Sequence, residues 1–296
     1  MMIGRVLRRV VGVAMIVCFA ANLKQKQLLT DSPLHEVLHT KVYAFLSGPG
    51  STITPSGLVR LLQEAAMVNT LRLKLSSPEL MASDGLSWVL RRQHVQVRRW
   101  PVMNEALKIV TAPTGFHRRL QTFRDFYVYD QTDQLIATAA TEWLLMDLKS
   151  RRLRPIPQRV LAISEGLIDA EHRLSPPPGK NWAGDLVDHT YTTRVRHSQL
   201  DFNNHLTNPA YVDLLLDGAP HECTEALKLT GFAIEFLEEA RWRDELTIHC
   251  TAVRQEDGTA EIYKKVDRLD EPPTVRLQHR LLRGDATLAT MRSSWR

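Results

Sequence analysis

The chain has 296 residues, of which 44% are hydrophobic and 24% are charged, and it carries a formal net charge of +5 at pH 7. This is the composition of a soluble globular protein, long enough for two domains, and it excludes disordered and fibrous classes. Three cysteines, Cys18, Cys223 and Cys250, are too few and too scattered for a disulfide framework or a zinc site, which favours a reducing compartment.

An apolar and basic extension occupies residues 1–35. It holds five basic residues and no acidic residue before Asp31. Its apolar core at 10–21 is shorter than the roughly 20 residues that span a bilayer. A secretory signal, an organelle-targeting segment, a membrane-surface anchor and an over-extended start all fit this pattern. We leave the extension out of the fold and expect a cytoplasmic protein, with a plastid or mitochondrion, and weak membrane association, as alternatives.

The segment 36–155 is predicted to form one strand, one long helix and then several strands. The helix begins at Thr54-Pro55, and apolar residues from Leu58 to Val68 recur at helical spacing. The strand before it is "LHTKVYAFL". The strands after it are "WVLRRQHVQVRRWP", "ALKIVTAPTG", "RRLQTFRDFYVYD" and "LIATAATEWLLMD".

The segment 187–296 repeats the same order after a linker, rich in proline and charge, at 156–186. Its first strand is "YTTRVRHSQLD", and its helix runs from Pro209 to Asp217. Four or five strands follow, predicted at 232–242, 244–253, 259–266, 274–282 and 286–295. One helix wrapped by an antiparallel sheet is the hot-dog arrangement. We therefore predict an α+β tandem hot-dog fold whose two sheets pair into one.

Polar side chains gather just before the second helix, at Asp201, Asn203 and His205. Alternate positions share one face of an extended strand or loop. Thr207-Asn208-Pro209 then starts a helix, with Asn as the expected cap, and the free N–H groups of such a start favour a developing anion. This pattern suits chemistry at a carbonyl group. The alternative is that Asp201 and Asn204 cap a turn and that His205 is an ordinary half-buried histidine.

A carboxylate is expected from the strand at 232–242, where Glu235, Leu237 and Glu239 share one face if the strand is extended. Glu239 is a candidate general base for water. In that scheme His205 orients the water, shares its proton or binds the substrate, while Asn203 donates to the carbonyl oxygen. Asp201 holds its neighbours in place.

The first copy lacks this polar set. Aligning Pro55 with Pro209 places Ser47, Pro49 and Ser51 opposite Asp201, Asn203 and His205. We expect one working site per chain, in the C-terminal half, with the N-terminal half shaping a pocket.

The chain from about residue 41 to 295 resembles the fatty acyl–acyl carrier protein thioesterases of plastids and bacteria. The resemblance is strongest at "LDFNNHLTNPAYVD", "IEFLEEA" and "ATEWLLMDLKSRRLRPIP". It implies that Asp201, Asn203, His205 and Glu239 are the catalytic residues. The position after the glutamate, often Cys in the plant enzymes, is Ala240, so a cysteine nucleophile is excluded and water or a carboxylate must attack.

The resemblance also implies the substrate, a long acyl chain on the phosphopantetheine arm of acyl carrier protein, and the product, a free fatty acid. No cofactor, metal or nucleic acid is expected, and the protein is a monomer or a homodimer. The pocket is expected at Leu58, Leu62 and Met67 and at 88–97. The basic residues that suit an acidic carrier are Arg118, Arg119, Arg151, Arg152 and Arg154. An acyl-CoA thioesterase or hydratase, and a non-catalytic acyl-binding protein, remain the alternatives.

Overall fold

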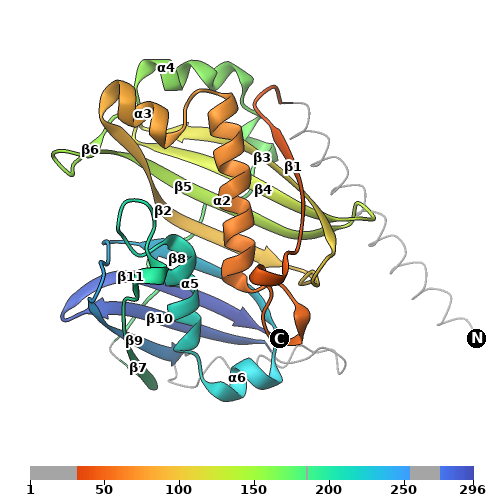
Figure 1. Cartoon of the computed structure of the whole chain (residues 1–296), viewed down its shortest axis with the longest axis vertical. Coiled ribbons are helices and arrows are strands. Elements are labelled where there is room, and N and C mark those ends of the chain that lie inside the picture. The colour runs from red at the N-terminus through yellow and green to blue at the C-terminus, as the bar shows by residue number, and fades with distance from the viewer. Residues whose placement is uncertain (1–31, 185, 254–273) are drawn as a thin grey trace, which may run out of the picture.

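The computed structural model describes residues 32–184, 186–253 and 274–296 (Figure 1). The apolar N-terminal extension up to residue 31 and the strand predicted at 259–266 lie outside these residues. The two halves follow one another in the chain and lie one beside the other in space, with their main helices on the same face of the sheet (Figure 1).

Eleven strands in the described part of the chain form one antiparallel sheet in the order β1-β3-β4-β5-β2-β8-β11-β10-β9-β7, with β6 paired to β5. The strands of the first half are β1 (Glu36–Lys41), β2 (Leu86–Val97), β3 (Ala106–His117), β4 (Gln121–Asp130), β5 (Leu135–Asp147) and β6 (Leu153–Arg154). Those of the second half are β7 (His189–Arg194), β8 (Leu229–Phe236), β9 (Glu245–Ala252), β10 (Val275–Arg283) and β11 (Ala286–Trp295).

Two helices pack side by side on this sheet, α2 (Pro55–Arg72) and α5 (Asn208–Asp217). The side chain of Thr54 accepts a hydrogen bond from the N–H of Gly57 at 2.9 Å, so α2 starts where its Thr-Pro signal predicts. The buried faces of both helices and the inner face of the sheet enclose one large apolar core. The remaining helices among the residues that the structure describes are α3 (Ser77–Asp84), α4 (Gln158–Leu161), α6 (His221–Ala226) and the short 3-10 turns Ala44–Leu46, Pro49–Ser51, Ala162–Gly166, Ala170–His172 and His197–Gln199.

The two halves meet at the antiparallel pairing of β2 with β8, so the predicted continuous sheet and tandem hot-dog fold are confirmed. Glu235 of β8 is buried and accepts hydrogen bonds from Arg92 of β2 at 2.7 and 2.9 Å. Gly231 fits here because a side-chain carbon would lie 2.6 Å from the carbonyl oxygen of Val95. The junction of the two halves is therefore held by the hydrogen bonds between β2 and β8, by the ion pair of Arg92 with Glu235, and by the close approach of the two backbones at Gly231.

The predicted linker at 156–186 is packed rather than free. Val160 of α4 is buried in a small apolar cluster with Leu80 and Leu145. Further along, the N–H of Lys180 donates to Glu235 at 3.1 Å, and the N–H of Ala183 donates to Gln278 at 2.7 Å. The linker is thus a strap held on both halves of the sheet.

The internal repeat is offset by one residue from the alignment of the two prolines. Equivalent hydrogen bonds join Gly48 N–H to the Thr52 carbonyl at 2.9 Å and Asp201 N–H to the His205 carbonyl at 2.8 Å. The counterparts of Asp201, Asn203 and His205 are therefore Gly48, Gly50 and Thr52, not Ser47, Pro49 and Ser51. The reason is that Pro55 is the first residue of α2, whereas Pro209 is the second of α5.

The same comparison identifies the first-half counterpart of Glu239. Ile53 N–H donates to the Pro101 carbonyl at 3.0 Å, as Leu206 N–H donates to the Ala240 carbonyl at 2.8 Å. Trp100, just before Pro101, therefore stands where the second half has Glu239. Its indole N–H donates to the carbonyl of Leu229 in the other half, at 2.6 Å.

Candidate active site

The segment from Asp201 to His205 is a tight turn, so of the two conformations expected there, strand or loop, the extended strand is wrong. The Asp201 carboxylate accepts the backbone N–H groups of Asn203 at 2.8 Å and His205 at 3.1 Å. Asn204 has a φ of +62°, a conformation that Asn tolerates better than most residues. The turn-capping geometry, considered as the alternative, is therefore present for Asp201. It brings the backbone of Asn203 and His205 together around one carboxylate.

Helix α5 follows this turn directly. Its N-cap is Thr207, which makes no side-chain cap bond, and Asn208 is the first helical residue rather than the predicted cap. The first-turn N–H groups of a helix lack partners within it and carry partial positive charge. The cavity described below is lined by Thr207 and Asn208, so this helix start faces it.

Glu239 lies in the loop after β8, because that strand ends at Phe236 rather than continuing to residue 242 as predicted. It therefore does not share a strand face with Glu235 and Leu237. The loop nevertheless returns to the turn, since His205 and Arg241 form an isolated β-bridge. As a result Nε2 of His205 lies 3.1 Å from Oε2 of Glu239. The imidazole is mostly buried, with 19% of its side chain exposed, whereas Glu239 is 35% exposed.

Two residues that the sequence reasoning missed hold the Glu239 loop. The Tyr211 hydroxyl donates to the Glu238 carbonyl at 2.9 Å and accepts the Ala240 N–H at 2.9 Å. Burial raises the pKa of Tyr211 well above its ordinary value, so the hydroxyl keeps its proton. Arg283 of β10 donates to the Glu239 carbonyl at 3.1 Å. Tyr211 has a helical, apolar context in the sequence, which predicts only a core aromatic.

A third missed contact comes from the first half. Arg151, in the turn between β5 and β6, forms an ion pair with Oε1 of Glu239. The two oxygens of Glu239 therefore have separate partners, His205 on one and Arg151 on the other. The sequence grouped Arg151 with neighbouring arginines that suit a carrier protein, and its separation from Glu239 in the chain gave no sign of this contact.

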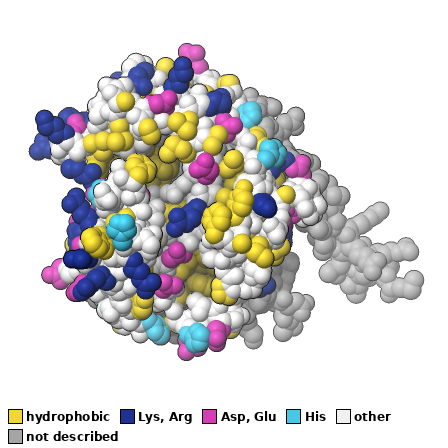
Figure 2. All heavy atoms as spheres, viewed as in Figure 1, with side chains coloured by type: hydrophobic (Ala, Val, Ile, Leu, Met, Phe, Trp, Pro, Cys, Tyr) yellow, Lys and Arg dark blue, Asp and Glu magenta, His cyan; other side chains and the backbone are white. Residues whose placement is uncertain are grey.

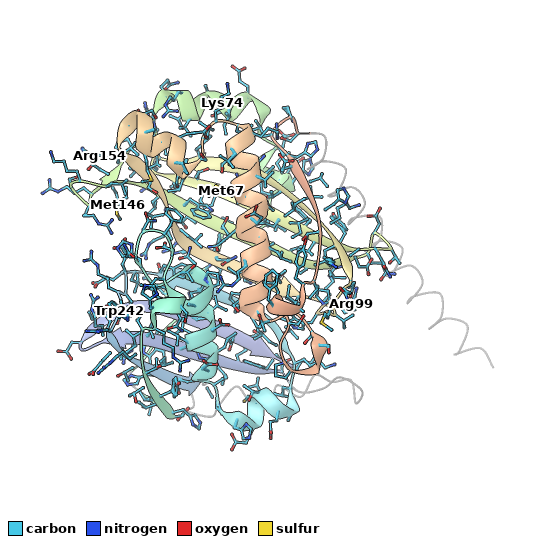
Figure 3. All side chains as sticks on the ribbon, in the orientation of Figure 1. Met67, Lys74, Arg99, Met146, Arg154 and Trp242 are labelled. Atoms are coloured by element: carbon cyan, nitrogen blue, oxygen red, sulfur yellow. The ribbon has the colours of Figure 1, made fainter. Side chains whose placement is uncertain are left out.

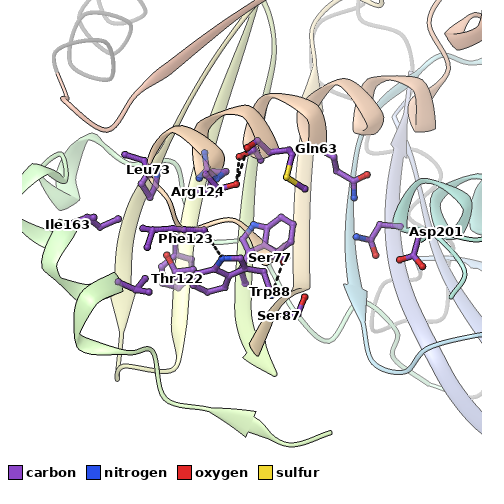
Figure 4. A pocket seen from close by; sticks show the side chains of 18 of the residues that line it. Gln63, Leu73, Ser77, Ser87, Trp88, Thr122, Phe123, Arg124, Ile163 and Asp201 are labelled. Carbon is purple, nitrogen blue, oxygen red and sulfur yellow. Dashed lines mark hydrogen bonds between the residues drawn. The ribbon is translucent and has the colours of Figure 1, made fainter. Parts of the chain in front are cut away.

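A cavity of about 270 Å³ runs from the turn at Asp201 into the first half, between α2 and the sheet (Figure 4). Asp201 lies at one end and Ile163 at the other, with Trp88 and Phe123 between them (Figure 4). Its wall is mostly apolar, formed by Ala66, Met67, Leu73, Leu75, Trp88, Pro113, Phe116, Phe123, Trp143, Val160, Ile163 and Phe202, with polar Gln63, Thr70, Ser77, Ser87, Thr122, Arg124, Asp201, Asn203, Thr207 and Asn208.

The predicted pocket residues are found only in part. Met67 of α2 and Trp88 of β2 line the cavity, whereas Leu58 and Leu62 lie in the sealed core. The buried cation Arg124 is an addition: it donates to Asn69 at 2.9 Å and to Thr111 at 3.2 Å. Burial lowers the pKa of Arg124 to about 10, so it remains charged at neutral pH.

Neither cysteine in the described part of the chain, Cys223 or Cys250, stands next to Glu239 as a nucleophile. Ala240 occupies the position next to Glu239 and is fully buried. Cys250 is buried on β9, and burial raises the pKa of its thiol to about 12. Within residues 32–184, 186–253 and 274–296, no group of His, Cys, Asp and Glu is arranged to hold a metal ion. Over the same residues, no helix is long and apolar enough to cross a membrane.

Two family models cover most of the chain. The acyl-ACP thioesterase N-terminal domain matches residues 41–164, and the acyl-ACP thioesterase C-terminal domain matches residues 185–295. A relative from Cuphea viscosissima, a chloroplastic acyl-[acyl-carrier-protein] hydrolase, is 25% identical over 245 residues. That alignment covers 78% of this chain and 58% of the relative, so the chain spans less than two thirds of the plant protein's length.

Solved structures share the fold. An acyl-ACP thioesterase from Bacteroides thetaiotaomicron superposes with a TM-score of 0.73 at 18% identity, covering 89% of this chain and 98% of that one. The 12:0-ACP thioesterase from Umbellularia californica gives a TM-score of 0.73 at 20% identity, covering 89% of this chain and 94% of that one. Both structures support the tandem arrangement of two hot-dog halves in one chain.

Proposed function

The chain belongs to the acyl-ACP thioesterase family, and from this premise we propose that it hydrolyses acyl-acyl carrier protein to a free fatty acid and the carrier thiol. The observation that carries the proposal is the 3.1 Å contact between His205 and Glu239 beside the turn that forms one end of an apolar cavity. An acyl chain fits the cavity, and a thioester at its end lies beside Asn203 and the start of α5.

In the proposed reaction Glu239 acts as the general base. Its carboxylate takes a proton from water while the water oxygen bonds to the thioester carbon. The side-chain amide of Asn203 and the N–H groups at the start of α5 stabilise the negative charge on the carbonyl oxygen. The carbon–sulfur bond then breaks, and the proton held by Glu239 passes to the leaving sulfur. His205 keeps the carboxylate oriented and shares that proton.

The carrier is proposed to dock along the basic edge near the cavity. Figure 2 shows Lys and Arg side chains gathered along the left margin of the face that carries α2 and α5. Arg118 and Arg119 are exposed in the turn between β3 and β4, and Arg151, Arg152 and Arg154 are exposed at the hairpin of β5 and β6. Such charges steer an acidic partner at long range and weaken with added salt.

A product assay tests the proposal. Acyl chains of several lengths are offered on carrier protein and on coenzyme A, and free fatty acid is measured. We expect faster release from the carrier, and a loss of at least about a hundredfold in kcat for Glu239→Gln and Asn203→Ala. Glu238→Gln, an exposed neighbour in the same loop, is the matched control. Near-normal turnover by both site variants would refute the assignment, and faster turnover of acyl-CoA would refute the carrier preference.

A further inference from the structure

The guanidinium of Arg151 occupies a place that none of its neighbouring arginines share. It binds Oε1 of Glu239, the oxygen that faces away from His205. Arg154, on the same hairpin, bonds Asp147 instead, at 3.2 Å. Figure 3 places Arg154 on the same side of the molecule as Trp242, which follows Glu239 by three residues. One arginine of the hairpin is therefore directed at the catalytic loop.

The hairpin that carries Arg151 is organised around one carboxylate. Asp147, the last residue of β5, accepts the N–H groups of Ser150 at 2.7 Å and Lys149 at 3.1 Å. The hydrogen bonds from Ser150, and after them the hydrogen bond and charge of Arg154, lower the pKa of Asp147 to about 2. Arg151 itself has a φ of +58°, a left-handed conformation that closes the turn. The turn thus holds the backbone of Arg151 in place independently of the contact between its side chain and Glu239.

The contact also differs from the other supports of Glu239 in its origin. Tyr211 and Arg283 bind backbone groups of the Glu239 loop, and both belong to the second half. His205, also of the second half, holds one oxygen of the side chain. Without Arg151 the side-chain contacts of the carboxylate reduce to the one with His205, which alone would restrain rotation about its last bond. A carboxylate bound at both oxygens still has lone pairs left for a water molecule.

We infer that Arg151 is a positioning residue supplied by the first half. It holds the carboxylate of Glu239 in the orientation in which this carboxylate takes a proton from the water that attacks the thioester. The inference rests on the proposed function, which makes Glu239 the base. The ion pair is weak in itself, because its two side chains are 43% and 35% exposed and solvent screens them. Its contribution is to geometry, since small misplacements of a catalytic group lower rates steeply.

Steady-state kinetics with acyl-carrier and acyl-pantetheine substrates test the inference. We expect Arg151→Ala to lower kcat about tenfold on both substrates with KM changed less than about threefold. Arg151→Lys should recover part of kcat, because it restores a cation to Oε1. The control is Arg159→Ala, which removes an ion pair with Asp84 away from the site. The side chains of Arg159 and Asp84 are 42% and 33% exposed, nearly the same as those of Arg151 and Glu239. This control should leave kcat unchanged.

Three results would overturn the inference. An unchanged or higher kcat in Arg151→Ala would show that Glu239 needs no such clamp. A rise in KM for the carrier substrate alone, matching Arg152→Ala, would make Arg151 only a docking residue. Equal losses in Arg151→Ala and Arg159→Ala would point to general destabilisation.

Carbon-13 NMR of the glutamate carboxyl groups separates this inference from the proposed function. The Glu239 signal is assigned by its disappearance in Glu239→Gln. We expect Arg151→Ala to shift it and Arg159→Ala to leave it in place. If the wild type releases no acid from any thioester, the proposed function fails, while this signal still shows whether Arg151 holds Glu239.

Discussion

The hydroxyl of Tyr211 accepts the backbone N–H of Ala240 at 2.9 Å. The same hydroxyl donates to the carbonyl on the other side of Glu239, that of Glu238. Because β8 ends at Phe236, these backbone groups have no neighbouring strand, and a buried backbone group without a partner is costly. The Tyr211 hydroxyl therefore supplies the hydrogen bonds that a neighbouring strand would otherwise make to this loop, and it links the loop to α5.

Replacing that phenol should lower both the turnover rate and the stability of the fold. Tyr211→Phe is expected to lower kcat about tenfold and the free energy of unfolding by about 1–3 kcal/mol, because Glu238 and Ala240 lose their partner. Tyr127→Phe, a buried tyrosine on β4, is the control and should leave kcat unchanged. Urea unfolding and single-turnover rates measure the two effects. A full kcat in Tyr211→Phe would show that the Tyr211 hydroxyl is not needed to hold Glu239 in place.

Asp201 offers a clear test of charge against geometry. Its carboxylate accepts two backbone N–H groups, from Asn203 and His205, and an amide oxygen can do the same. Asp201→Asn should therefore keep most of kcat, whereas Asp201→Ala should lose more than about tenfold as the turn loosens. Thioester hydrolysis compares the two. Equal loss in both variants would mean that the negative charge itself takes part in the reaction.

Chain-length preference should respond to the wall of the cavity at Ala66. This residue of α2 is nearly buried and faces the space that Met67 also lines. A leucine there adds three carbons and takes up room for about three methylene groups of substrate, each worth roughly 0.8 kcal/mol. Ala66→Leu should thus lower kcat/KM for the preferred chain by more than about tenfold and move the fatty acid product profile to shorter chains. An unchanged profile would place the acyl tail elsewhere.

A buried histidine should make the protein sensitive to acid. His279 of β10 is fully buried beside Ser293, and burial lowers its pKa to about 3. The unfolded chain binds a proton near pH 6.5 and the folded chain does not, so stability is complete above that pH and is lost as the pH falls towards 3. The loss is up to about 1.4 kcal/mol for each pH unit.

Urea unfolding at pH 7 and pH 4.5 measures this dependence. His279→Gln keeps a hydrogen-bonding group near Ser293 and removes the titration. We expect its stability to change less between the two pH values than that of the wild type. A histidine that contributes nothing would give equal slopes for both proteins.

The sequence was sufficient for the fold because its signals are local. Thr54-Pro55 fixes the start of α2, and runs rich in apolar, β-branched and aromatic residues bounded by turn signals mark most of the strands. It was insufficient where the chain leaves a regular element. Nothing in "IEFLEEARW" shows that β8 stops at Phe236, since the break depends on Tyr211 from another element. The error about the face of Glu239 follows from assuming that the strand went on.

The site illustrates the same limit. Asp201, Asn203 and His205 are close in sequence, so motif and resemblance single them out together, although their turn geometry was not foreseen. Arg151 lies in the other half, and only the pairing of the two sheets brings it to Glu239. Long-range contacts of this kind leave no periodic or compositional trace in one chain.

Trp100 shows what joining the two copies in one polypeptide permits. In a symmetric homodimer every substitution appears twice, so a tryptophan could not replace a glutamate in one subunit without replacing it in the other. Covalent linkage lifts that restriction. At the position equivalent to Glu239, the indole N–H of Trp100 donates to the carbonyl of Leu229 across the junction of the two halves. The half that lacks the proposed catalytic residues therefore contributes a contact that holds the two halves together.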